Sequence, residues 1–205
     1  MAISEAILNH HPLIAGRLGT RVLRHPTELV EWRHVSGPRS GVPVFGYLGQ
    51  LTPNKGVDVL VDAARRGGHR LVVAGRGRLE QQVRSAGDTV DYLGWVSGVD
   101  REKFFDRIDC LVVPSVWEEP AGLAVNEAYA RGIPVIATRA GGLPEYVPDA
   151  CRDLLVPAND RAALDAAMAK FAADPEHYLP GLPDESRSWD RHVRDMLDVY
   201  ELAAS

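Results

Sequence analysis

The sequence predicts an α/β fold in which a parallel sheet is covered by helices on both faces. From Pro43 onward, short runs that are apolar throughout alternate with segments whose apolar residues recur at helical spacing. Strands that lack a polar face are buried on both sides, and crossover helices bury a parallel sheet in this way. We therefore expect a doubly wound, Rossmann-like domain.

The expected elements alternate in the order that such a domain requires. Apolar runs predict strands at 42–49, 69–75, 89–94, 109–115, 134–138 and 153–157. Amphipathic segments predict helices at 57–67, 78–87, 100–108, 122–132 and 160–174, and several of them end at glycine, which favours helix C-termini. A last helix is expected at 188–203, after the proline-rich connection "YLPGLPDES".

The first 42 residues differ from the rest of the chain in their sequence pattern. The stretch 1–42 shows weak periodicity and ends in "SGPRSG", which has the composition of a linker. We interpret 1–42 as an N-terminal arm and 43–205 as one domain that includes the terminal helix. A chain of 205 residues can bury one sizeable core, but hardly a second full domain.

Composition excludes several classes of protein. The formal net charge of −5 argues against a nucleic-acid binder, whose surface would be basic. Two cysteines give no support for a disulfide framework or a zinc site, and we expect Cys110 to be a buried thiol. No stretch approaches the ~20 apolar residues of a membrane span. The expectation is a soluble, cytoplasmic protein without a transmembrane segment.

The loop after the first expected strand, "GQLTPNKG", has the outline of a phosphate site. Gly49 permits a tight passage of the chain, and Lys55 stands next to the start of the helix at 57–67. A cation beside the free N–H groups of a helix start favours an anionic ligand. An ordinary surface lysine before a helix fits the same pattern, so this loop alone leaves both interpretations open.

The loop after the second expected strand, "AGRGRL", does not match a dinucleotide-binding fingerprint. Gly75 and Gly77 begin a G-x-G-x-x-G pattern, but Glu80 stands where the third glycine belongs. This spacing argues against a dehydrogenase. We expect the two glycines to form a turn that borders the ligand.

Two glutamates eight positions apart, Glu119 and Glu127, flank the start of the helix at 122–132. Eight helical residues span roughly 12 Å, too far for a close acid pair, although spacing alone does not exclude an inverting hydrolase. The free N–H groups of the helix start favour an anion between the two acids. Because carboxylates repel phosphate, we expect each acid to accept hydrogen bonds from hydroxyls at one end of a diphosphate. The alternatives are a first-turn acid at Glu119 and a solvated acid at Glu127.

Together, these motifs resemble the C-terminal, donor-binding domain of the family 4 retaining glycosyltransferases, which have the GT-B fold. The similar stretches are "LGQLTPNKGVD", "LVVAGRG", "YLGWV", "CLVVPSVWEEPAGLAVNEAYARGIPVIAT" and "AGGLPEYV", and they cover about residues 43–175. The resemblance implies transfer of a glycosyl unit from a nucleotide diphosphate sugar to an acceptor hydroxyl, with retention. It implies no required metal or other cofactor.

The resemblance also implies a role for individual residues. Glu119 would contact the donor sugar and Lys55 the diphosphate, so these are the expected catalytic residues, while Glu127 would bind the ribose hydroxyls. In the loop "GGLPEY", Glu145 either lies near the donor or simply begins a helix. The other expected donor-binding residues are Gly49, Gln50, Gly75, Gly122, Leu123 and Gly142.

Two departures from the family bear on activity. Gln50 stands where many members have arginine, which removes from the phosphate clamp a charge-assisted bond of roughly 1.5–3 kcal/mol. A complete GT-B enzyme also has an N-terminal acceptor-binding domain, in place of which this chain has a 42-residue arm. We therefore expect the donor half of an enzyme that needs a separate or missing acceptor domain or subunit.

Other functions stay open at this point. A catalytically inactive nucleotide-sugar-binding or scaffold module of the same fold is the main alternative. An epimerase or a phosphorylase of this fold has less support, because neither additional acid/base residues nor the sequence context of a pyridoxal phosphate lysine is found.

Overall fold

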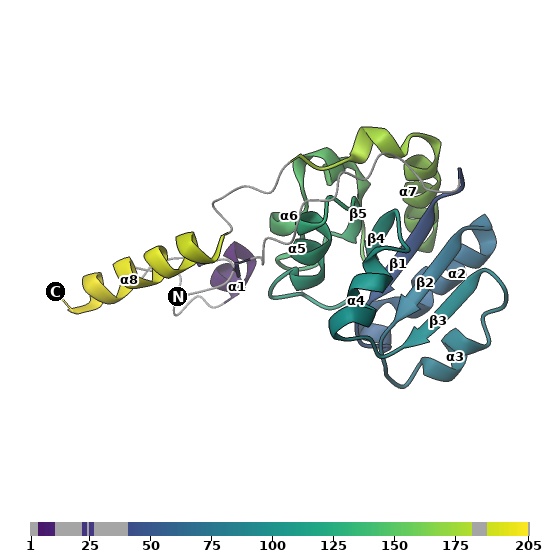
Figure 1. Cartoon of the computed structure of the whole chain (residues 1–205), viewed down its shortest axis with the longest axis horizontal. Coiled ribbons are helices and arrows are strands. Elements are labelled where there is room, and N and C mark those ends of the chain that lie inside the picture. The colour runs from purple at the N-terminus through teal and green to yellow at the C-terminus, as the bar shows by residue number, and fades with distance from the viewer. Residues whose placement is uncertain (1–3, 11–21, 24, 27–40, 182–187, 205) are drawn as a thin grey trace.

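The computed structural model describes residues 4–10, 22–23, 25–26, 41–181 and 188–204 (Figure 1). Its centre is a six-stranded sheet in the order β3-β2-β1-β4-β5-β6, in which every neighbouring pair is parallel. The predicted doubly wound sheet is confirmed, and each strand lies inside a predicted apolar run. The strands are β1 Val44–Leu48, β2 Arg70–Ala74, β3 Val90–Gly94, β4 Cys110–Val113, β5 Val135–Thr138 and β6 Leu155–Val156.

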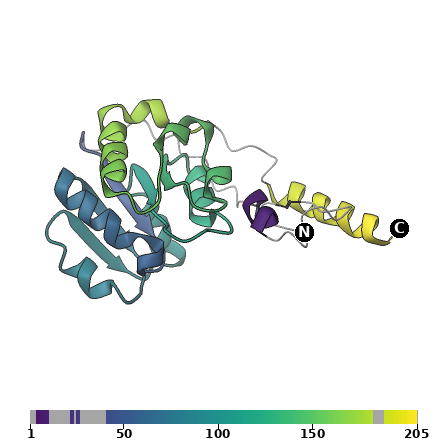
Figure 2. The same ribbon diagram turned by 180° about the vertical axis from the view of Figure 1, so that it is seen from behind.

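Helices cover both faces of the sheet. The helices α4, α5 and α6 lie in front of the sheet in Figure 1, and α2 and α7 cover the other face, which is seen in Figure 2. The short helix α6 and three 3-10 turns (Pro53–Lys55, Asp149–Leu154 and Pro175–Tyr178) are additional to the predicted elements. The helices of this domain are α2 Val57–Gly67, α3 Glu80–Arg84, α4 Gly98–Phe105, α5 Leu123–Ala130, α6 Leu143–Tyr146 and α7 Arg161–Ala173.

The burial of the strands explains their apolar sequences. All four residues of β5 are buried, although successive side chains of a strand point to opposite faces. On the α7 side of the sheet, the ring of Phe45 packs edge-on against that of Phe171, with centroids 5.7 Å apart. The edge strand β3 is only partly covered. Two helical layers thus bury the middle of the sheet from both sides.

Two helices lie at the end of the molecule opposite the edge strand β3 (Figure 1). They are α1 Glu5–His10 and α8 Trp189–Ala204, of which the second confirms the predicted terminal helix (Figures 1 and 2). Most of the predicted arm falls outside the described residues, so its boundary near residue 42 stays a prediction. In the described part of the chain, no helix combines the length and apolar character needed to cross a membrane. On α8, Trp189, Val193, Leu197 and Tyr200 are exposed at helical spacing.

The two cysteines give a first testable prediction, since both are free and fully buried. Burial raises the pKa of the Cys151 thiol from 9.0 to about 11, and raises that of Cys110 well above its usual range. We expect neither thiol to react with a disulfide reagent at about pH 8 until the chain is unfolded. An aromatic disulfide titration with and without denaturant measures this; fast reaction of the native protein would contradict the buried positions.

The same shift has a consequence for stability at high pH. The unfolded chain ionises Cys151 near its usual value of 9.0, whereas the folded chain keeps this thiol protonated until about 11. The protonated Cys151 thiol therefore makes its full contribution to the free energy of unfolding below pH 9.0, and this contribution is lost as the pH rises to about 11. Denaturant unfolding across that range should show a falling free energy of unfolding.

Candidate functional site

The strand order places one crevice at the carboxyl edge of the sheet. The crossover after β1 leads to β2 on one side, and the crossover after β4 leads to β5 on the other side. In doubly wound sheets, the divergence of two such loops opens a ligand-binding crevice beyond the strand ends. A pocket of about 310 Å³ lies here, and we call it the switch-point pocket. Six predicted residues line it, namely Gly49, Gln50, Lys55, Glu119, Gly122 and Leu123.

Lys55 and Glu119 form an ion pair in this pocket. The Nζ of Lys55 lies 2.5 Å from Oε1 of Glu119, and the two side chains are 28% and 12% exposed. Their loops are also joined by the backbone, because the N–H groups of Val116 and Trp117 both donate to the carbonyl of Asn54. Each residue was predicted for this site, but their direct pairing was not. The pair presents one cation and one carboxylate side by side at the crevice.

Ser115 fixes the carboxylate of Glu119, and Thr138 in turn fixes Ser115. The Oγ of Ser115 donates to Oε1 of Glu119 at 2.7 Å, and Ser115 is 1% exposed. The hydroxyl of Thr138 in turn donates to the backbone carbonyl of Ser115 at 2.6 Å. A carboxylate fixed in this way keeps one orientation toward the pocket. Sequence reasoning missed both hydroxyl residues; their only signal was their place just after β4 and at the end of β5.

The start of α5 supplies the positive end of a helix. Gly122 precedes the first helical residue, Leu123, and among the described residues no side chain caps the N–H groups of the helix start. The first turn carries no acidic residue. Residues 121–125 all line the switch-point pocket. Unpaired N–H groups and the helix dipole therefore meet Lys55 at one place, which favours an anion there.

Tyr47 holds the turn at Gly49 and Gln50 by a hydrogen bond. The hydroxyl of Tyr47 donates to the Gln50 carbonyl at 2.7 Å, and burial, with smaller contributions from Glu119 and Asp58, raises the pKa of this tyrosine far above its usual value. Tyr47 thus remains a hydrogen-bond donor at any ordinary pH. Gln50 itself lines the switch-point pocket.

Gly75 supports this turn and does not line the switch-point pocket. A Cβ atom on Gly75 would lie 1.8 Å from the carbonyl oxygen of Gly49, so only glycine permits the approach of the two loops. Its own carbonyl accepts a 2.8 Å bond from the hydroxyl of Tyr92. The structure therefore gives Gly75 a position one layer behind the predicted binding surface.

Gly142 does not line the switch-point pocket either, but contacts Glu119, which does. Its N–H donates to the backbone carbonyl of Glu119 at 2.7 Å, which ties the loop after β5 to the loop after β4. Glu145 lies in the first turn of α6, and its two carboxylate oxygens accept bonds of 3.0 Å from the N–H groups of Glu5 and Ala6. Of the two interpretations of Glu145, the helix-start acid is the observed position, with a contact to α1 that the sequence did not indicate.

Glu127 lies in a second pocket of about 300 Å³, which is lined by residues of α4 and α5 together with Pro26 and Trp189 and which we call the α4–α5 pocket. Leu123 lines both this pocket and the switch-point pocket, so the two hollows adjoin. The carboxylate of Glu127 forms an ion pair with Arg101. The two predicted glutamates therefore lie in adjoining hollows on either side of the α5 start.

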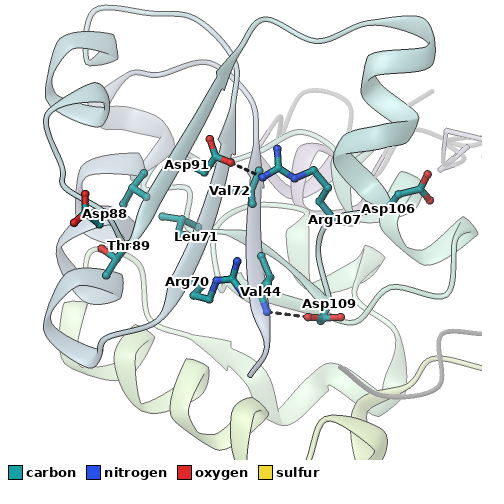
Figure 3. A pocket seen from close by; sticks show the side chains of 11 residues that line it. Val44, Arg70, Leu71, Val72, Asp88, Thr89, Asp91, Asp106, Arg107 and Asp109 are labelled. Atoms are coloured by element: carbon teal, nitrogen blue, oxygen red, sulfur yellow. Dashed lines mark hydrogen bonds and ion pairs between the residues drawn. The ribbon is translucent and has the colours of Figure 1, made fainter. Parts of the chain in front are cut away.

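A further hollow of about 580 Å³ lies at the opposite edge of the sheet (Figure 3). Arg107 pairs there with Asp91, and Oδ2 of Asp109 accepts a 2.8 Å bond from the N–H of Val44. None of the predicted site residues lines it, and it lies at the amino ends of the strands, where doubly wound sheets do not place their ligands. Within the described ranges, no group of three His, Cys, Asp or Glu side chains could hold a metal ion.

A protein-family model matches most of this chain. The model described as "Glycosyl transferases group 1" matches residues 30–180. Among curated proteins, the D-inositol 3-phosphate glycosyltransferase of Saccharomonospora viridis is 34% identical over 192 residues, which cover 80% of this chain and 44% of that protein. The GDP-mannose-dependent alpha-mannosyltransferase of Mycobacterium tuberculosis is 31% identical over 164 residues, with 78% and 43% covered. The chain thus spans about half the length of the curated relatives it matches.

Solved structures agree with this assignment. The sucrose-phosphate synthase of Thermosynechococcus elongatus superposes with a TM-score of 0.78 at 27% identity, and the match covers all of this chain and 58% of that one. Anabaena HepE in complex with UDP-glucose has a TM-score of 0.77 at 20% identity, with 99% and 62% covered, which is a likeness of fold. On the family match over residues 30–180, this chain belongs to the group 1 glycosyl transferases.

Proposed function

We propose that this chain is the donor-binding half of a retaining glycosyltransferase of family 4, corresponding to the C-terminal domain of a GT-B enzyme. It would bind a nucleotide diphosphate sugar and transfer the sugar to an acceptor hydroxyl. The observation that carries this proposal is the meeting of Lys55, Glu119 and the uncapped start of α5 in one pocket. The dependence of a 31% identical relative on GDP-mannose, as its name states, supports a nucleotide sugar as the donor.

Lys55 and the α5 start would stabilise the leaving group. When the bond between the sugar and the diphosphate breaks, its electron pair stays on the diphosphate, whose negative charge grows. An ammonium group has three donors, so Lys55 can keep its bond to Glu119 and still donate to a phosphate oxygen. Preorganised donors of this kind contribute several kcal/mol each in a site that excludes water. No metal or other cofactor takes part in this proposal.

Glu119 and Glu127 would hold the two ends of the donor. Glu119, fixed by Ser115, would accept hydrogen bonds from hydroxyls of the sugar. Glu127, in the adjoining pocket, would accept them from the ribose. The diphosphate would then lie near Leu123, the residue that both pockets share.

The acceptor site would lie outside this chain. The curated relatives are about twice as long as the matched region, which supports a partner domain or subunit that binds the acceptor. The expected cytoplasmic location stays a prediction. Gln50 favours a second candidate, a nucleotide-sugar-binding module without catalysis, because one cation of the family's phosphate clamp is absent. Binding without transfer or donor hydrolysis, with an acceptor-domain protein supplied, would select that candidate.

Thermal unfolding with a panel of UDP, GDP and ADP tests the proposed site. At a concentration 100 times its Kd, the correct nucleotide should stabilise the fold by about 2.7 kcal/mol and raise Tm by roughly 5–10 °C. The matching nucleosides, which lack the diphosphate, are the control and should give a much smaller shift. If none of the three diphosphates nor their sugars raises Tm, the proposed function is wrong.

A further inference from the structure

Arg101 and Glu127 form a pair that joins α4 to α5. The terminal nitrogen Nη2 of Arg101 donates to Oε2 of Glu127, and the two side chains are 39% and 28% exposed. Both residues line the α4–α5 pocket, so the pair belongs to its wall. Oε1 of Glu127 accepts no hydrogen bond from any residue that the structure describes. One carboxylate oxygen is therefore held, and the other is available to the pocket.

The surroundings of this pair make it rigid. Arg131 binds both carboxylate oxygens of Glu102 at 3.1 and 2.5 Å and lies 4.3 Å above the ring of Phe105. Arg131 also donates to the backbone carbonyl of Glu127 at 2.7 Å. This second arginine fixes the backbone of α5 against α4 at the position from which Glu127 extends. The only group that fixes the Glu127 carboxylate itself is Arg101, among the described residues.

The pair also changes the charge of the pocket wall. A nucleoside diphosphate is an anion, and a lone carboxylate beside it would repel it. The guanidinium of Arg101 offsets that charge, and the oxygen of Glu127 that Arg101 does not bind can still accept a hydrogen bond from a neutral hydroxyl. Arginine suits this role because its charge persists at any pH at which the protein is folded.

We infer that Arg101 is a positioning residue that makes the nucleotide site selective for ribose. It holds Glu127 so that the available oxygen accepts a hydrogen bond from a ribose hydroxyl. This inference rests on the proposed function, because it names the ligand of the α4–α5 pocket as the nucleoside part of the donor. Arg101 would act through Glu127 and would not itself contact the hydroxyl.

The inference is tested by the affinities of the full chain for paired nucleotides. Isothermal titration compares UDP, GDP and ADP with their 2′,3′-dideoxy counterparts, which lack both hydroxyls. We expect the unmodified chain to prefer the ribonucleotide by about tenfold or more, the size of one hydrogen bond to a charged group. In R101A and in E127Q this preference should fall to roughly threefold or less, and R101K should restore part of it.

A double-mutant cycle separates positioning from general damage. If Arg101 acts through Glu127, R101A should have no effect on the ribose preference once E127Q is present. The matched control is R107A, which breaks a different arginine–carboxylate pair, that of Arg107 with Asp91 just beyond the end of α4, and should leave the preference unchanged. Tm of each variant is measured alongside, so that a loss of folding is recognised.

Three results would overturn the inference. They are an unchanged ribose preference in R101A, an equal loss of affinity for both nucleotides in that variant, and an effect of R101A that persists beside E127Q. In each case the ribonucleotide still binds the unmodified chain, so the proposed function would stand. If no nucleotide binds the unmodified chain, the proposed function and the inference are both wrong.

Discussion

Replacing Lys55 by alanine should weaken the binding of nucleoside diphosphates by roughly 10- to 100-fold. The variant loses a charge-assisted hydrogen bond of about 1.5–3 kcal/mol. It also leaves Glu119, only 12% exposed, without the ammonium group that offsets its charge beside the anion. Because Ser115 still donates to Glu119, the carboxylate keeps its place and its repulsion of phosphate grows. Isothermal titration with the nucleotide that raises Tm most measures the loss.

Two further variants make the Lys55 result specific. Lys103→Ala removes an exposed lysine of the same charge that pairs with Asp100 on α4, and it should bind as the unmodified chain does. Adding Glu119→Gln to Lys55→Ala should restore part of the affinity for a nucleoside diphosphate, since the carboxylate no longer repels it. An affinity within twofold of the unmodified chain in Lys55→Ala would mean that Lys55 does not bind the diphosphate.

Replacing Gly56 by alanine should destabilise the fold more than any other single change considered. Gly56 has φ +69°, and a Cβ atom there would lie 1.9 Å from the carbonyl oxygen of Pro114. The substitution therefore adds an overlap with the backbone after β4 to the ordinary cost of a left-handed residue, and we expect a loss of about 4 kcal/mol or more. For a chain of this size, Tm should fall by roughly 10 °C or more.

Gly68 offers a matched control for this prediction. It has φ +67°, but a Cβ atom there would meet nothing within 4 Å. Gly68→Ala therefore has the backbone strain without the overlap, and should cost about 1–2 kcal/mol, with a fall in Tm of only a few degrees. Equal losses in the two variants would show that the contact between Gly56 and Pro114 does not limit stability. Gly56→Ala should also weaken nucleotide binding, because it separates the loops that carry Lys55 and Glu119.

The fold could be predicted from the sequence nearly in full. Each strand lies inside a predicted apolar run, because a strand buried on both faces must be apolar along its length. The helices were found by their periodicity and their glycine ends, although α3 and α5 are shorter than predicted. The short helix α6 and the 3-10 turns have too few residues to show a period, and α6 was indicated only by one of the two interpretations of Glu145.

The candidate site could be predicted only as a set of residues. The rule that ligands bind at the carboxyl ends of parallel strands led to Lys55, Glu119 and the start of α5, all of which line one pocket. It did not distinguish residues at the pocket surface from those behind it. Gly75 and Gly142 lie in the second group, where they hold the backbone of Gly49 and Glu119.

The sequence by itself determined the α/β class, the order of the elements and the loops in which the charged residues lie. These features depend on local patterns of burial and turn formation, which neighbouring residues encode. Only the tertiary structure decided which side chains meet. The partners Lys55 and Glu119 are 64 positions apart, and Arg101 and Glu127 are 26 apart. Such contacts depend on the strand order and on the packing of α4 against α5, which bring separate loops to one edge of the sheet and which no local pattern records.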